Sequence, residues 1–132
     1  MDASDVISTG MSAERTLVVP PEQTVGYMLE GMPMVFATPM MIQQMELAAY
    51  DAVQRHLPSG WVTVGAAVDI RHLAASPVGA TVRTTAKVVA VERRIVRFEV
   101  ASFDGERKIG EGFHARGLIN IENFSKRLTG SK

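Results

Sequence analysis

The pattern of apolar and polar positions predicts one long helix in the first half of the chain. Between residues 36 and 53, apolar side chains recur at helical spacing and share one stripe at about 100° per residue: Met41, Ile42, Met45, Ala48, Ala49, Ala52 and Val53. Thr38 is expected to be the N-cap, with Pro39 at the first helical position, where a missing N–H costs nothing. The breaker cluster at 56–60 ends the helix.

After residue 60 the periodicity changes to two, which indicates strands. Alternating, β-branched stretches cover 61–70, 80–92, 95–103 and 108–121, and Asp104-Gly105 is a strong hairpin signal. A shorter stretch at 16–19 predicts a first strand, and residues 22–35 predict an apolar loop of the kind that serves as a lid. We expect a flexible arm at 1–14 and a single domain at 15–132. This order predicts an α+β fold in which an antiparallel sheet wraps around one long central helix.

Composition narrows the possible partners. The chain has 132 residues, 14 basic and 14 acidic side chains, and no cysteine. A net charge of zero argues against nucleic acid or an anionic membrane as partner. The absence of cysteine excludes a disulfide framework, and the three histidines have no metal-ligand spacing. The N-terminus is not typical of a signal peptide and no run is long enough for a membrane span. We therefore expect a cytoplasmic protein with no metal and no cofactor.

Glu46 is the first candidate for chemistry. It lies between Met45 and Leu47 in the otherwise apolar helix, beside the apolar stripe. Burying a carboxylate there costs several kcal/mol unless it is paired. A functional role and a boundary residue that reaches water both fit this position.

Several short stretches resemble one known family. They are VVPP at 18–21, VFAT at 35–38, ME at 45–46, VGAAVDIRH at 64–72, AASPVGATV at 74–82, SFDG at 102–105 and IGEGFHARGLINIENF at 109–124. Their order and spacing resemble the fluoroacetyl-CoA thioesterase branch of the hotdog-fold thioesterases. The resemblance covers nearly the whole chain beyond the N-terminal arm, and it implies a hotdog fold.

The resemblance implies a site and an activity. It assigns the catalytic set to Thr38, Glu46 and His72 and places Gly65 near the acyl group. Pocket-lining residues are then expected from the lid and the helix start, namely Met32, Met34, Phe36 and Met41. The implied activity is hydrolysis of a small or medium acyl-CoA to the free acid and CoA, with coenzyme A as part of the substrate. The lid is several residues shorter than in the family, and Met32 replaces a lid phenylalanine, so we do not expect strict fluoroacetyl-CoA selectivity.

The spacing of the candidate residues bears on assembly. Thr38 and Glu46 are eight residues apart, or roughly 12 Å along one helix, which is too far for both to reach one carbonyl carbon. Either Thr38 acts through an intermediary, or Thr38 of one subunit joins Glu46 of another. Hotdog relatives are obligate dimers, so we favour a homodimer, with a dimer of dimers also open. A non-catalytic acyl-CoA-binding protein and a hotdog dehydratase are the alternative functions.

Overall fold

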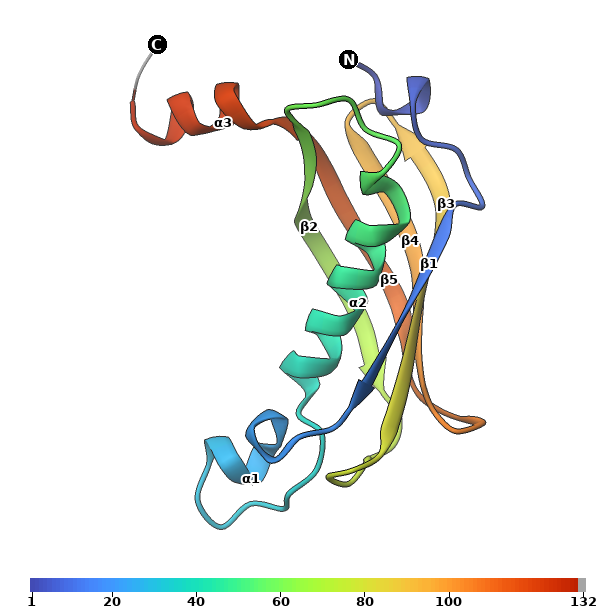
Figure 1. The fold of residues 1–132 in the computed structure, drawn as a ribbon, viewed down its shortest axis with the longest axis vertical. Helices are drawn as coiled ribbons and strands as arrows, with labels where there is room; N and C mark the ends of the chain where they lie inside the picture. The colour runs from blue at the N-terminus through green and yellow to red at the C-terminus, as the bar shows by residue number, and fades with distance from the viewer. Residues whose placement is uncertain (131–132) are drawn as a thin grey trace.

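The computed structural model describes residues 1–130 as one antiparallel sheet curved around a long helix (Figure 1). The strands are β1 (Ser12–Val18), β2 (Trp61–His72), β3 (Thr81–Glu92), β4 (Ile95–Asp104) and β5 (Arg107–Asn120). Their order across the sheet is β1-β3-β4-β5-β2, and every neighbouring pair is antiparallel. The expected α+β architecture is confirmed, and the four strands after the helix lie within two residues of their predicted bounds.

The central helix α2 (Thr38–Gln54) lies on the concave face of the sheet (Figure 1). Its buried face carries three alanines, Ala48, Ala49 and Ala52, which let the helix approach the strands closely. Larger side chains from the sheet, including Val82, Val96 and Phe98, complete the core. The remaining short elements are η1 (Ala3–Asp5), η2 (Pro21–Gln23), α1 (Val25–Met28) and α3 (Ile121–Leu128). Within residues 1–130, no helix combines the length and apolar character needed to cross a bilayer.

The start of α2 differs by one residue from the prediction. Ala37, not Thr38, is the N-cap, Thr38 is the first helical residue, and no side chain caps the helix. The physical reason is that the Thr38 hydroxyl is bonded to His72 instead, with Oγ1 2.7 Å from Nδ1. The hydroxyl that would ordinarily cap the helix is thus directed at a histidine.

The N-terminal segment also differs from expectation. The flexible arm was predicted at 1–14 and the first strand from residue 16, but strand β1 begins at Ser12, and the residues before it are in contact with the sheet. Ala3 and Ile7 are buried in the core, and the Ala3 N–H donates to the Arg93 carbonyl. Burial of these two apolar side chains favours an ordered segment over a free one.

Strand β2 is one edge of the sheet and is bulged in its middle. Its register against β5 shifts between Gly65 and Ala67. Residues Gly65 to Asp69 are exposed along this edge. A long edge strand with free N–H and C=O groups favours pairing with another chain.

Candidate functional site

Thr38 and His72 meet at the end of the molecule where α2 begins and β2 ends. Thr38 lies on the first turn of α2, and His72 is the last residue of β2. The 2.7 Å contact between Thr38 Oγ1 and His72 Nδ1 is short enough for proton transfer between them. Both side chains line a hollow of about 400 Å³ whose other walls are largely apolar: Val25, Val35, Phe36, Leu73, Ala74 and Ala75.

The environment of His72 keeps its imidazole neutral. Burial lowers the pKa of His72 below its ordinary value of 6.5, and the Ala74 backbone opposes only part of that shift. Its Nε2 atom is buried and has no hydrogen-bond partner within residues 1–130. A neutral histidine with one nitrogen on a hydroxyl and the other unused is suited to moving a proton.

Glu46 lies halfway along α2 and faces strand β2. Its side chain is half-buried, in a second hollow lined also by Gln43, Leu47, Tyr50, Val64, Gly65 and Arg116. A Cβ atom placed on Gly65 would lie 2.5 Å from Glu46 Oε1, so a larger residue there would displace the carboxylate from this position. Within residues 1–130, Glu46 makes no hydrogen bond or ion pair. The carboxylate is therefore held beside the strand and free to act on a ligand.

A buried arginine, Arg116, and a buried histidine, His114, lie near the Glu46 carboxylate. Arg116 is only 7% exposed and donates from Nε to Thr63 Oγ1 (2.9 Å), from Nη2 to the Thr63 carbonyl (2.8 Å) and from Nη1 to His114 Nε2 (3.2 Å). His114 donates from Nδ1 to the Ala67 carbonyl at 2.8 Å, which leaves Nε2 as the acceptor for Arg116. These bonds fix the tautomer of His114 and the orientation of the guanidinium.

The electrostatics of this group are dominated by burial. Burial lowers the pKa of His114; the hydrogen bond to Ala67 and the charge of Glu46 oppose the shift, and Arg116 adds to it. Burial also lowers the pKa of Arg116, whereas Glu46 and Tyr50 raise it. A neutral His114 beside a cationic Arg116 gives the Glu46 hollow a positive wall, which favours an anionic ligand group or transition state.

Neither Arg116 nor His114 is among the candidate residues named from the sequence. The signal for Arg116 was present: His114, Arg116 and Leu118 alternate along β5 and all are buried. A charge in phase with buried neighbours on a strand indicates a partner within the core.

Within one chain the two groups stay apart. Gly65 and His72 are seven residues apart on β2, or about 23 Å along an extended strand. The Thr38–His72 hollow and the Glu46–Gly65 hollow have no lining residue in common. The structure thus brings Thr38 to His72 and Glu46 to Gly65, and one protomer does not bring the two pairs together.

The four side chains expected to line the acyl pocket occupy different environments. Phe36 is 1% exposed and forms part of the Thr38–His72 hollow. Met32 and Met34 lie in the lid and are 47% and 46% exposed. Met41 does not line either hollow: it is fully buried in the core, where its sulfur fills the space left by Gly110. Its helical position turns it toward the sheet rather than toward the lid.

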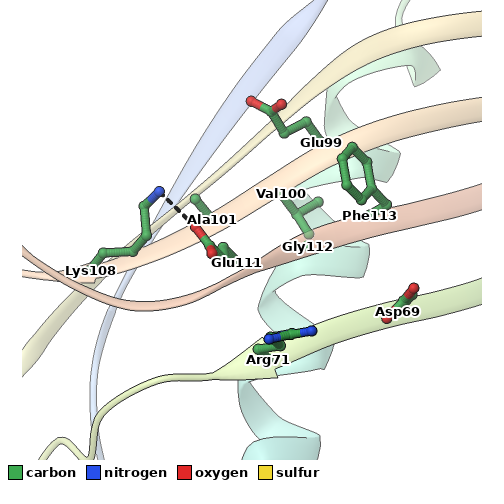
Figure 2. Close-up of a pocket in the computed structure, with 9 residues that line it drawn as sticks. All are labelled: Asp69, Arg71, Glu99, Val100, Ala101, Lys108, Glu111, Gly112 and Phe113. Carbon is green, nitrogen blue, oxygen red and sulfur yellow. Dashed lines mark hydrogen bonds and ion pairs between the residues drawn. The ribbon is translucent and has the colours of Figure 1, made fainter.

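A larger hollow, of about 480 Å³, lies on the opposite face of the sheet (Figure 2). Its walls carry mixed charges, and Lys108 is paired with Glu111 at 2.9 Å. Figure 2 shows Asp69 and Arg71 on β2, across from Glu99 and Phe113 on β4 and β5. None of the candidate residues lines this hollow, so we place the site on the helix side. Within the described part of the chain, no three His, Asp or Glu side chains are placed to hold a metal ion.

Comparisons with known proteins agree with this geometry. Residues 19–122 match the family described as fluoroacetyl-CoA-specific thioesterase. The fluoroacetyl-CoA thioesterase of Streptantibioticus cattleyicolor is 35% identical over 130 residues, which cover 94% of each chain. A variant of a fluoroacetyl-CoA thioesterase, solved with fluoroacetate and CoA, superposes with a TM-score of 0.82 at 35% identity, covering 89% of this chain and 99% of that one.

A more distant structure supports the fold alone. A hot-dog-like protein from Thermanaerovibrio acidaminovorans has a TM-score of 0.89 at 22% identity, and the match covers 98% of this chain and 96% of that chain. The hotdog architecture and the family expected from the sequence are therefore confirmed. This chain belongs to the fluoroacetyl-CoA-specific thioesterase family.

Proposed function

We propose that this protein hydrolyses acyl-CoA thioesters at a site assembled from two subunits. The observation that carries the proposal is the division of the candidate residues into two pairs, Thr38 with His72 at the end of the edge strand β2 and Glu46 with Gly65 near its middle. The first pair supplies a hydroxyl and an imidazole but no carboxylate, and the second pair supplies the carboxylate. The relative solved with fluoroacetate and CoA supports an acyl-CoA as the substrate.

Association of the β2 strands of two subunits would bring Thr38 and His72 of one subunit beside the Glu46–Gly65 position of the other. If two β2 strands lie antiparallel with the symmetry axis at Asp69, the bulge brings Gly65 of one subunit beside the partner subunit's His72. This axis passes through the exposed part of the edge. Asp69 and Arg71 are two residues apart on the outer face of β2, so each Asp69 would lie diagonally from the partner subunit's Arg71 (Figure 2). At this axis the two Asp69 side chains lie opposite each other, and the diagonal contacts with Arg71 offset their repulsion.

The joined site contains the groups that thioester hydrolysis needs. The Glu46 carboxylate attacks the thioester carbonyl carbon or activates the water that does so. The Thr38 hydroxyl and the positive end of the α2 dipole face the carbonyl oxygen as it gains negative charge. His72, neutral at pH 7, donates from Nδ1 to Thr38 Oγ1 across the 2.7 Å contact, which leaves the hydroxyl hydrogen for the carbonyl oxygen. The products are the free acid and the CoA thiol, and the protein residues alone supply the chemistry.

The hollow beside Thr38 favours a small or medium apolar acyl group. Its walls are mostly apolar, and the shorter lid carries Met32 and Met34 as flexible side chains that adapt to different shapes. Such walls discriminate weakly between acyl groups of similar size. We therefore propose that the protein does not select strictly for fluoroacetyl-CoA.

Subunit complementation tests the proposal directly. The two variants Thr38→Val and Glu46→Ala are purified as homodimers and as mixed dimers carrying two different tags, and CoA thiol release is measured on a panel of acyl-CoAs. Each homodimer should keep no more than about 1% of the wild-type rate. In a composite site, the mixed dimer has one intact site and one doubly altered site, so purified mixed dimers should recover about half of the wild-type rate.

The control is a mixed dimer of wild type with the double variant, which should be active only if both pairs can come from one chain. Activity of this control together with inactivity of the complementing pair would refute the composite site. Binding of acyl-CoA with no thiol release by the wild type would instead favour the non-catalytic alternative.

A further inference from the structure

The C-terminal helix α3 carries an apolar stripe that its own chain leaves exposed. Ile121, Phe124 and Leu128 fall on one side of the helix, and Glu122, Lys126 and Arg127 fall on the other. Ile121 is 47% exposed and Leu128 is 74% exposed, while Phe124 is half-buried. Helices of eight residues are marginal in water unless an apolar face is packed. The stripe therefore needs a covering surface.

A second apolar surface lies uncovered on the lid, residues 22–35. Its exposed large side chains are Tyr27, Met28, Leu29, Met32 and Met34, with exposed fractions between 46% and 66%. The Thr24–Phe36 bridge closes the base of the lid, and the Val35–Pro77 bridge holds the lid to the body, beside the Thr38–His72 hollow. Five exposed large apolar side chains in one short segment mark an interaction surface.

The topology places these two surfaces at opposite ends of β2. Helix α3 begins where Asn120 pairs with Trp61, and the Ile121 N–H donates to the Gly60 carbonyl at 2.9 Å. The lid adjoins the other end, next to His72 and Pro77. Figure 1 shows α3 extending past the β2 edge of the sheet, on the side away from β1. Within residues 1–130, α3 packs mainly against β5.

We infer that α3 of each subunit docks on the lid of its partner in the dimer. This inference rests on the proposed function, since antiparallel β2 pairing is what brings the start of β2 in one subunit beside the end of β2 in the other. The charges are complementary as well. The lid carries Glu22 and Glu30 and no basic residue, whereas α3 carries Arg127 and also Lys126, which is paired with Glu122 at 3.1 Å. The partner's helix would then complete the mouth of the acyl pocket.

Because the chain has no cysteine, crosslinking between introduced thiols tests the inference without background. Leu128→Cys is placed in one tagged subunit and Leu29→Cys in the other, and mixed dimers are treated with a short bis-maleimide. The matched control replaces Leu29→Cys by Val89→Cys, an exposed position (40%) on the outer face of the sheet. We expect a covalent dimer from the Leu29 pair at a yield at least about tenfold above the Val89 pair.

A second measurement reads the effect on the lid. In the double variant Phe124→Ser/Leu128→Ser, amide hydrogen exchange in the lid should become about tenfold faster, whereas Glu122→Ser on the polar side should leave it unchanged. Equal crosslinking of both pairs, or unchanged lid exchange in the double variant, would overturn the docking of α3. Light scattering on the same samples shows whether the dimer forms, and thiol release shows whether the thioesterase is active. Failure of the proposed function is therefore distinguished from failure of α3 docking.

Discussion

The substitution Gly65→Ala tests whether the position of the Glu46 carboxylate controls the reaction. A Cβ at residue 65 would lie 2.5 Å from Glu46 Oε1, whereas ordinary van der Waals contact begins at 3.4 Å. The carboxylate must therefore shift by about 1 Å, and a misplacement of that size costs about 100-fold in rate. This loss corresponds to about 2.7 kcal/mol of transition-state stabilisation. We expect kcat for thiol release to fall by about two orders of magnitude.

We expect the Gly65→Ala variant to fold. The nearest atom to the new methyl group is the end of a flexible side chain, and alanine is better tolerated than glycine inside a strand. Gly117→Ala on β5 is the matched control, because a Cβ there meets nothing within 4 Å. Steady-state kinetics measures kcat of both variants, and thermal unfolding measures their stability. If Gly65→Ala keeps kcat within about threefold of wild type while Glu46→Ala abolishes it, the reasoning is refuted.

Three further predictions concern the other polar groups. Burial lowers the pKa of His72, so kcat/KM should be constant near pH 7 and fall only as the pH drops through that lowered pKa, below 6.5; a loss of activity already between pH 8 and 7 would contradict a neutral His72. Thr38→Val should reduce kcat by about 100-fold, whereas Thr38→Ser, which keeps the hydroxyl on His72, should retain most activity; equal losses would argue against the hydroxyl. Arg116→Met leaves three acceptors on Thr63 and His114 without their donor, and should lower the free energy of unfolding in urea by about 1–3 kcal/mol; a gain in stability would mean that burying the cation outweighs its hydrogen bonds.

The sequence was sufficient for the architecture because local signals and burial agree along most of the chain. The helical stripe through Met41, Met45 and Ala48 is the buried face of α2, and the period-two stretches after residue 60 are the strands. The N-terminal segment was harder to predict, because Ala3 and Ile7 are isolated apolar residues whose burial depends on the groove that the sheet and α2 provide.

The candidate site was only partly accessible from the sequence. The resemblance named Thr38, Glu46 and His72, but only coordinates show that Thr38 meets His72 and that Gly65 meets Glu46. The ligand-binding roles of these residues remain predictions. The Arg116 network depends on a tertiary contact with Thr63 across two strands, which no local pattern specifies.

The bulge between Gly65 and Ala67 has a consequence for the geometry of catalysis. Gly65 and His72 are separated by an odd number of residues, and a regular strand would point such positions to opposite faces of the sheet. The extra residue restores the phase, so that both positions face α2, one toward Glu46 and the other toward Thr38. Removing one residue here would turn one half of each proposed site to the other face of the sheet. The length of this short segment, more than the identity of its side chains, holds the two halves of the site on one face.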